Sequence, residues 1–243
     1  AVLGNSGVVR AVEVGPGVDG IEIGGTYLFF GTGVSDEFGY MRLAHAYDAP
    51  RTVGMLARRA PVPARNLFAI PEGSAATLAQ WAAFSLRYMT AWSNWQVAYG
   101  CFRTQLSAVD VPEPHVWGCG GGTTLAELEL AQRHGCKATM LSGNDENLAR
   151  IRASGIEAID RRDFPHLVYD TDRYGRDGEY RAAYKESEKK FLATVADRTE
   201  GRGVQIFVDY IGLATLRATQ KALGRMGVIT TAGWKHGMDT PSN

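Results

Sequence analysis

The stretch His115 to Leu141, HVWGCGGGTTLAELELAQRHGCKATML, decides the fold of the chain. It opens with a short apolar run that leads into a cluster of four glycines, at Gly118, Gly120, Gly121 and Gly122. Apolar residues then recur at helical spacing, at Leu125, Leu128 and Ala131. Gly135 is typical of the residue that ends a helix, and a second apolar run follows it. The stretch therefore predicts a strand, a glycine turn, a helix and a second strand.

Glycines at such a turn are typical of dinucleotide-binding folds. The chain must turn tightly into the helix while its backbone approaches a pyrophosphate, whose charge the helix N-terminus stabilises. An ordinary strand-to-helix turn also explains a glycine cluster taken alone. The following segment supports the first interpretation, because Asn144 to Ser154 begins with an N-cap residue and carries two acids in its first turn. Thr123 and Thr124 stand where the fingerprint usually has its third glycine.

Strand and helix patterns continue to alternate toward the C-terminus. Further strands are expected at 156–159, 204–208 and 228–231, and helices at 191–199 and 213–223. The polar, tyrosine-rich stretch 164–190 is interpreted as an insertion, because a compact domain seldom needs so long a connection. This order predicts an α/β fold with a doubly wound parallel (Rossmann) sheet and right-handed crossovers. We place the nucleotide-binding domain at 107–243.

The first part of the chain, residues 1–106, is expected to be a β-rich domain with linking helices. Strands are predicted at 8–14 and 27–30, joined by tight turns, and the pattern from 31 to 69 is irregular. A helix is predicted from Leu78 to Met89, followed by a second one through Trp95 and Val97. The aromatic residues of this region favour a core role, and a pocket wall is the alternative for Tyr88 and Trp92. Ala1 opens the chain in mid-pattern, so we expect sequence before it.

The composition is that of an ordinary folded chain of 243 residues, 45% hydrophobic and 21% charged. Lys and Arg together number 26, as do Asp and Glu, so no basic surplus argues for nucleic acid or an anionic membrane. Three cysteines are too few for a disulfide framework and have no zinc-binding spacing. No apolar run approaches the roughly 20 residues that span a bilayer. A cytoplasmic protein that binds neither nucleic acid nor membrane is expected.

The order of these motifs resembles the medium-chain dehydrogenase/reductase superfamily. The resemblance rests on Gly15-Pro16-Gly17 after a valine-rich strand, on the glycine turn, and on the segment from Arg202 to Gly212. It is strongest to the zinc-independent quinone and enoyl-thioester reductases, and the long insertion is similar to the crotonyl-CoA reductase/carboxylase branch. The resemblance implies a partial, GroES-like barrel domain before the Rossmann domain, a cofactor in the cleft between them, and a homodimer.

The resemblance also implies which residues bind the cofactor. Zinc-containing members use a Cys and His set, but His45 has no cysteine partner before Cys101, so no metal is expected. NAD enzymes place an acid after the second strand, where this chain has Ser142, Gly143 and Asn144, so NADP(H) is the expected cofactor. Arg161 or Arg162 would bind its phosphate, although Asp145 lies close in sequence. The cofactor-binding set is Gly118, Gly120, Gly121, Gly122, Thr123, Ser142, Gly143, Asn144, Arg161, Gly212 and Gly233.

The implied reaction is NADPH-dependent reduction of an α,β-unsaturated thioester or ketone, on a small-molecule or carrier-bound acyl substrate. Thr90 matches the family position that borders the nicotinamide, although Trp92 replaces the usual tyrosine two residues later. His236 or Lys235 would donate the proton, and a surface histidine is the alternative for His236. Two other functions stay open. One is reductive carboxylation of an enoyl thioester, and the other is an inactive nucleotide-binding scaffold.

Overall fold

The computed structural model describes residues 3–46 and 53–232. The chain forms two compact units, Ala1–Met89 and Thr90–Asn243, which divide inside the long helix α1 (Leu78–Gln105). The expected domain boundary after residue 106 stays a prediction, since one helix belongs to both units. Each unit is described by itself.

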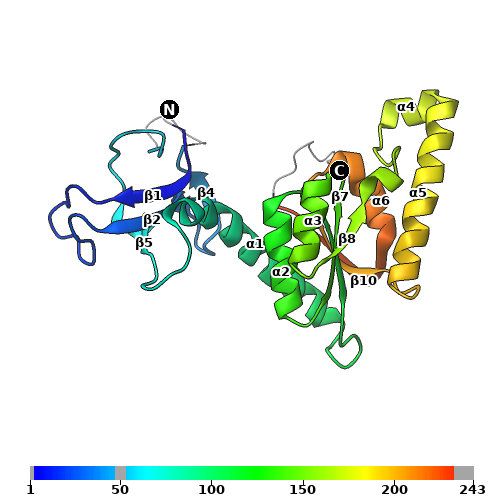
Figure 1. Cartoon of the computed structure of the whole chain (residues 1–243), viewed down its shortest axis with the longest axis horizontal. Helices are drawn as coiled ribbons and strands as arrows, with labels where there is room; N and C mark the ends of the chain where they lie inside the picture. The colour runs from blue at the N-terminus through cyan, green and yellow to red at the C-terminus, as the bar shows by residue number, and fades with distance from the viewer. Residues whose placement is uncertain (1–2, 47–52, 233–243) are drawn as a thin grey trace. The chain divides into compact units, whose positions relative to one another are not determined.

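The second unit is built on a five-stranded parallel sheet (Figure 1). Its strands lie in the order β10-β9-β6-β7-β8, and their bounds are β6 (His115–Cys119), β7 (Lys137–Ser142), β8 (Glu157–Asp160), β9 (Val204–Asp209) and β10 (Leu223–Thr230). The chain runs outward from β6 to β8 on one side and from β9 to β10 on the other. The expected doubly wound sheet is confirmed, and its direction reverses between β6 and β9, where such sheets bind ligands.

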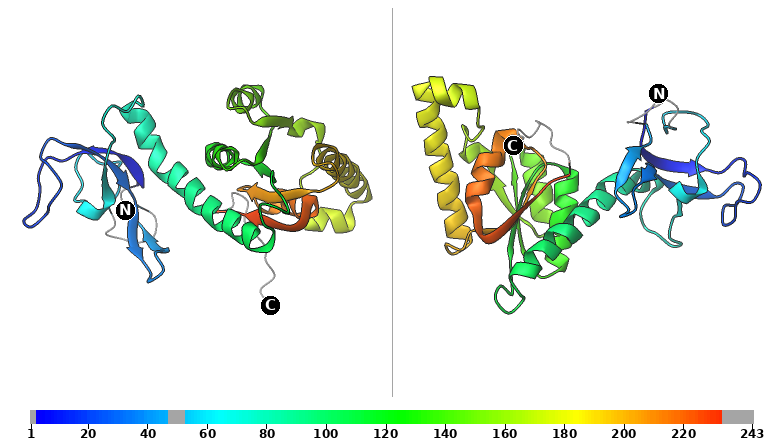
Figure 2. Two further views of the ribbon diagram at one scale, coloured as in Figure 1. Left: turned by 90° about the horizontal axis from the view of Figure 1, so that it is seen from below. Right: turned by 180° about the vertical axis from the view of Figure 1, so that it is seen from behind.

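Helices cover both faces of this sheet because successive strand side chains point to opposite sides. Val116, Met140 and Ile206 pack under α2 (Gly122–Arg133), α3 (Asp145–Ala153) and the second half of α1. Trp117, Leu141 and Phe207 pack on the other side, with residues of α5 (Gly178–Arg198) and α6 (Leu213–Ala222). Figure 2 shows α5 and α6 across the sheet from α2 and α3. The strands therefore read as continuous apolar runs.

The insertion forms a short helix, α4 (Thr171–Arg176), and most of α5. Asp170 and Asp177 cap these helices by accepting hydrogen bonds from the amides of Arg173 and Tyr180. The insertion is joined to α6 through Arg217, whose guanidinium lies 4.6 to 5.9 Å from the ring centres of three tyrosines, Tyr169, Tyr174 and Tyr184. The contacts of Arg217 thus show how the insertion expected from the sequence is attached to the domain.

The first unit contains two small antiparallel sheets. One has the order β1-β2-β5, with β1 (Ser6–Arg10), β2 (Thr26–Phe30) and β5 (Leu67–Ala69), and the other pairs β3 (Thr32–Ser35) with β4 (Met41–Ala44). A 3-10 turn, Ala64–Asn66, precedes β5. The expectation of an irregular segment from 31 to 69 was wrong in part, because three short strands lie within it. The first strand also ends at Arg10, before Val12 and Val14, and a long loop rather than a tight turn leads to β2.

Two further boundaries differ from the sequence prediction. The two helices expected around Leu78–Met89 and Trp95 are one continuous helix, α1. Its second half is held by Trp95 and Phe102, both with no exposed surface. The last strand, expected at 228–231, begins earlier, because β10 already starts at Leu223 and its pairing with β9 shifts register between Leu223 and Val228. In both α1 and β10, contacts with the rest of the fold keep glycine or aromatic residues within a regular helix or strand.

Candidate nucleotide-binding site

The site is assembled where parallel strands end at one edge of the sheet. The pairing register aligns Cys119 with Leu141 and with Asp209, and Ser142 with Asp160. The segments that follow β6, β7, β8 and β9 therefore meet at the same edge. The structure brings together the predicted residues of the glycine turn, of positions 142–144, Arg161 and Gly212.

The glycine turn allows α2 to pack closely on β6. A Cβ atom added to Gly118 would lie 2.5 Å from Thr124 Cγ2, and one added to Gly120 would overlap Thr124 Oγ1. The two glycines on the strand side thus make room for Thr124, which replaces the usual third glycine on the helix side. Gly121 is the N-cap of α2, and a Cβ there would meet nothing within 4 Å. The backbone at Gly121 is open to a ligand at the helix N-terminus.

Arg161 lies directly over the backbone that follows β7. A Cβ atom added to Gly143 would come within 2.5 Å of Arg161 Nε and 3.0 Å of its Cγ. The absence of a side chain at Gly143 therefore lets the exposed side chain of Arg161 lie against this backbone. In the described part of the chain, no carboxylate forms an ion pair with Arg161. A cation at this position is suited to an anionic group.

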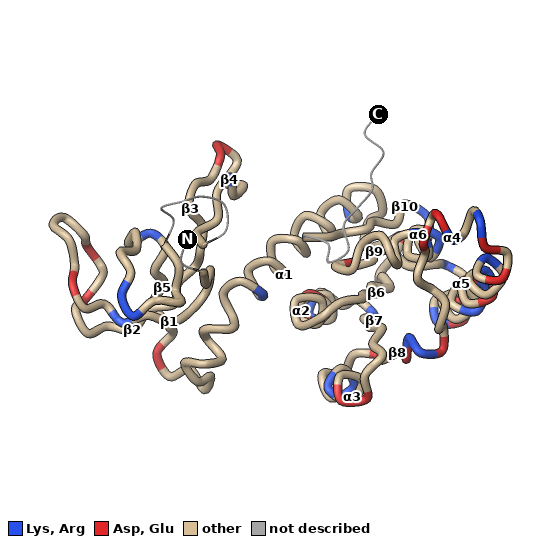
Figure 3. Tube along the Cα trace, turned by 90° about the horizontal axis from the view of Figure 1, so that it is seen from above, with Lys and Arg blue, Asp and Glu red and all other residues tan. Residues whose placement is uncertain are grey.

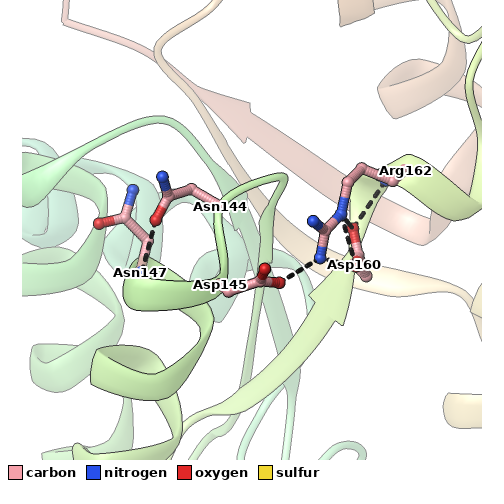
Figure 4. A network of polar contacts seen from close by, with 5 residues as sticks. All are labelled: Asn144, Asp145, Asn147, Asp160 and Arg162. Atoms are coloured by element: carbon pink, nitrogen blue, oxygen red, sulfur yellow. Dashed lines mark hydrogen bonds and ion pairs between the residues drawn. The ribbon is translucent and has the colours of Figure 1, made fainter.

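Arg162, the other candidate for a phosphate contact, is already occupied by two carboxylates (Figure 4). Its Nε lies 2.9 Å from both carboxylate oxygens of Asp160, and its Nη2 also pairs with Asp145. These contacts hold the pKa of both Asp160 and Asp145 below the ordinary value, chiefly through hydrogen bonds from Arg162. Arg162 thus neutralises the acid that would oppose a phosphate near position 142. Of the two arginines, Arg161 is therefore the better candidate for the phosphate contact, which stays a prediction.

Asn144 begins α3 and uses its side chain as a cap. Its Oδ1 accepts a hydrogen bond of 3.1 Å from the Asn147 amide, as Figure 4 shows. The N-cap predicted from the sequence is confirmed. The cap leaves the Asn144 Nδ2 group as the donor that a ligand could use.

The segment after β9 is held by the buried carboxylate of Asp209, which is 2% exposed. Its Oδ1 accepts from the amides of Ile211 at 2.9 Å and Gly212 at 3.0 Å, and its Oδ2 accepts from Thr215 and Thr219. Gly212 is the N-cap of α6 and has a φ of 88°, a conformation that favours glycine. Asp209 therefore fixes the course of the chain at the predicted contact Gly212.

The predicted catalytic residues are only partly within the described chain. Thr90 is half-buried on α1, one helical turn before Asn94, so the two lie on the same face of the helix. Trp92 is 52% exposed, so the core role favoured for it is wrong, whereas Trp95 is fully buried in the core. Gly233, Lys235 and His236 lie outside the described residues. Their roles stay predictions.

The structure also shows a polar cluster that sequence reasoning missed. It joins Asn94 of α1, Glu127 of α2 and Tyr210, the first residue after β9. Glu127 has no exposed surface, and its Oε2 accepts a hydrogen bond of 2.5 Å from the Tyr210 hydroxyl. A signal was present, because Glu127 shares a helical face with Thr124 and Ala131, both of which pack on the sheet.

Charged side chains of both signs lie along the helices of the second unit (Figure 3). Figure 3 shows Lys and Arg interspersed with Asp and Glu along α3, α4 and α5. In residues 3–46 and 53–232, no group of three or more His, Cys, Asp and Glu side chains is placed to hold a metal ion. No helix in those same residues has the length and apolar character that a membrane crossing requires. His45 is a half-buried side chain whose burial, together with nearby Arg65, lowers its pKa.

Solved structures of known proteins share this fold. An NAD-dependent alcohol dehydrogenase superposes with a TM-score of 0.71 at 22% identity, over 99% of this chain and 62% of its own. A mycobacterial protein complexed with NADPH gives 0.64 at 19% identity, over 99% and 59%. A 2-haloacrylate reductase gives 0.62 at 19% identity, over 100% and 60%. No protein-family model and no curated protein matches the sequence.

These likenesses define the class of fold. The chain shares the fold of these structures, in agreement with the Rossmann sheet expected from the resemblance. At these identities the comparison shows a shared fold. The chain spans about three fifths of the length of the three structures. The crotonyl-CoA reductase branch stays a prediction.

Proposed function

We propose that the chain binds NADP(H) at the C-terminal edge of its parallel sheet. The observation that carries the proposal is a pair of glycines at this edge, one with an open backbone and one covered by an arginine. Gly121 leaves the N-terminus of α2 accessible, and Gly143 lets Arg161 lie across the end of β7. The first position suits a pyrophosphate and the second suits a 2′-phosphate.

The residues present fit the phosphorylated cofactor better than the unphosphorylated one. Ser142, Gly143 and Asn144 carry no charge, and Arg162 neutralises the neighbouring Asp145. An NAD site would use a carboxylate here to accept hydrogen bonds from the ribose. Gly118, Gly120, Gly122, Thr123 and Gly212 would shape the turns around the dinucleotide, and Gly233 is assigned to the same edge from the sequence.

We further propose that the protein is an oxidoreductase that reduces an α,β-unsaturated thioester or ketone. When bound, NADPH supplies the hydride. The chain would orient the substrate and stabilise the oxyanion, with Thr90 as a hydroxyl donor. His236 or Lys235 would then give a proton to the substrate. The mycobacterial structure complexed with NADPH and the 2-haloacrylate reductase have the same fold, which supports this reaction class.

The test is NADPH consumption by the full-length protein, followed at 340 nm, in the presence of enoyl-CoAs, carrier-bound enoyl groups and quinones. We expect oxidation with an enoyl thioester. Binding of NADPH without oxidation by any of these acceptors would favour the inactive scaffold instead. Formation of a carboxylated product only when bicarbonate is present would favour the reductive carboxylase.

The proposed reaction needs no zinc, and this gives a separate prediction. Prolonged dialysis against a chelator should leave the rate of NADPH oxidation within about twofold of its starting value, because hydride transfer to an activated alkene requires no Lewis acid. Metal analysis of the dialysed protein is the control. Activity that is lost and then restored by zinc alone would contradict the metal-free mechanism. The acyl partner, a homodimer and a cytoplasmic location also stay predictions.

A further inference from the structure

We propose that Asn94, Glu127 and Tyr210 form a proton-binding site next to the glycine turn, and that Glu127 takes up a proton when a dinucleotide binds. The inference rests on the proposed nucleotide site and adds a coupling between that site and the pH. The three residues come from α1, α2 and the segment after β9. All three belong to the second unit.

The cluster is tightly connected but leaves the carboxylate incompletely satisfied. The Tyr210 hydroxyl donates to Glu127 Oε2 at 2.5 Å, and Asn94 Nδ2 lies 2.9 Å from the Tyr210 oxygen and 3.5 Å from Oε2. Glu127 Oε1 is buried and has no hydrogen-bond partner among the described residues. An ionised carboxylate buried with one oxygen unpaired is unfavourable, and protonation removes the buried charge.

No positive charge compensates the carboxylate in the described part of the chain. The groups that face it are the Asn94 amide from α1 and the Tyr210 phenol from the end of β9, and no Lys, Arg or His forms an ion pair with it. Burial therefore raises the pKa of Glu127 to about 7, against the opposing hydrogen bonds from Tyr210 and Asn94. Burial, followed by the charge of Glu127 and the hydrogen bond to it, raises the pKa of the Tyr210 phenol, so Tyr210 stays protonated.

The cluster is connected to the nucleotide site in two ways. Tyr210 Cβ lies 3.4 Å from the position of a Cβ atom on Gly120, so this side chain contacts the glycine turn. Glu127 is six residues beyond Gly121 along α2, which corresponds to about 9 Å at the helical rise of 1.5 Å per residue. A pyrophosphate at the helix N-terminus would therefore add negative charge close enough to disfavour an ionised Glu127 further.

The direction of the pH effect follows from these charges. The bound anion raises the pKa of Glu127 above its value in the free protein, so at a pH between the two pKa values binding draws a fraction of a proton from the solvent onto the carboxylate. Below pH 6 the group is already protonated and no uptake occurs. Above pH 7 the proton must be acquired during binding, so affinity falls as the pH rises. No electron or bond other than the O–H bond of Glu127 is involved.

The experiment is isothermal titration of the protein with NADPH, and with NADH, which lacks the 2′-phosphate. Titrations at pH 6, 7.5 and 9 should be run in pairs of buffers with different ionisation enthalpies, so that proton uptake is measured directly. We expect the wild-type dissociation constant to rise about tenfold from pH 6 to pH 9, the scale of one charge at this distance. At pH 7.5 we expect uptake of a fraction of a proton.

The test variant is Glu127→Gln, which is nearly isosteric, and the matched control is Glu129→Gln on the same helix. Glu127→Gln should reduce the pH dependence and proton uptake for both nucleotides, whereas Glu129→Gln should keep them. Tyr210→Phe removes a hydrogen bond that favours the ionised form, and it should move the midpoint of the pH dependence upward. Circular dichroism of each variant checks folding.

The possible results distinguish a failure of the proton site at Glu127 from a failure of the proposed nucleotide site on which it rests. Nucleotide binding with the same pH dependence in wild type and Glu127→Gln would overturn the proton site and leave the nucleotide site intact. Absence of binding at every pH, in wild type and variants alike, would overturn the proposed function and this inference with it. Loss of proton uptake in Glu129→Gln as well as in Glu127→Gln would overturn the assignment to Glu127.

Discussion

The proposed preference for NADP(H) depends on the backbone position Gly143 as well as on the charge of Arg161. The guanidinium reaches the end of β7 because Gly143 has no side chain in its way. Arg162, the next residue, carries the same charge but is paired with Asp145 and Asp160. Two adjacent arginines therefore have different roles. One is available to a ligand, and the other holds α3 and β8 together.

The first prediction concerns this selectivity. Arg161→Ala should weaken NADPH binding by about tenfold, roughly 1.4 kcal/mol, because it removes the cation expected to face the 2′-phosphate. NADH affinity should change little. Ser142→Asp should weaken NADPH binding in the same way and strengthen NADH binding, since the new carboxylate repels the phosphate and accepts from the ribose. Fluorescence titration with both nucleotides measures the change, and equal affinities for the two in wild type would contradict the prediction.

The second prediction concerns the proton donor. His236→Phe should lower turnover with an enoyl thioester by about 10²-fold, the usual scale for loss of a general acid, and leave NADPH affinity near its wild-type value. The reason is its sequence position just beyond the strand that faces the proposed nicotinamide site. Steady-state rates and NADPH titration are the two measurements. A rate within about threefold of wild type would exclude His236 as the donor.

At the residue scale, part of the candidate site could be predicted from the sequence. The glycines of the turn and Ser142 to Asn144 were found because their spacing is local. Arg162 forms an ion pair with Asp145, which is 17 residues away in sequence and adjacent in space. Glu127 was missed for the same reason, since its partners Asn94 and Tyr210 lie 33 and 83 residues from it. Contacts of this kind are not encoded in a local pattern.

The packing of α2 on β6 gives a prediction at the scale of elements. Gly118→Ala should lower the free energy of unfolding by about 1 to 3 kcal/mol, because its Cβ would overlap Thr124 Cγ2 and overpack the contact. Thr124→Ser removes the overlapping methyl group and keeps the hydroxyl, so it should restore part of the loss in the double variant. Gly121→Ala, at a position with open space, is the control. Urea unfolding measures all four proteins.

If the double variant is no more stable than Gly118→Ala, the contact between the new Cβ and Thr124 Cγ2 does not set the packing distance between β6 and α2. The 3.2 Å approach to Leu128 Cδ1 would then be the cause.

The elements themselves were predicted best where the apolar runs are long. The five parallel strands and the helices between them were identified because β6, β7 and β9 are buried over most of their length and β8 and β10 each contain a short apolar run. The short strands β3, β4 and β5 were not predicted, because each has only three or four residues and includes exposed positions. The break expected within α1 was wrong because burial of Trp95, Ala98 and Phe102 keeps the helix continuous there. Tertiary packing overrides local propensity in both cases.

On the scale of the whole molecule, the sheet order places the glycine turn of β6 beside the end of β9. This is the point where an open parallel sheet forms a crevice for ligands. The proposed cofactor contacts within the described chain all lie at that edge, although they are spread over more than 90 residues of sequence. The same edge carries the Glu127 cluster. The fold thus accounts for why a nucleotide site and a proton site would be neighbours.

The most direct test of the nucleotide site is a titration of wild type and Gly121→Val with NADPH, with thermal unfolding of both proteins as the control. The valine side chain would stand where the pyrophosphate must lie, while Gly121 has no neighbour within 4 Å of an added Cβ in the free protein. We expect wild type to bind NADPH and the variant to bind at least about 100-fold more weakly, about 2.7 kcal/mol, with an unchanged unfolding temperature. A folded Gly121→Val that binds NADPH as tightly as wild type would contradict the account.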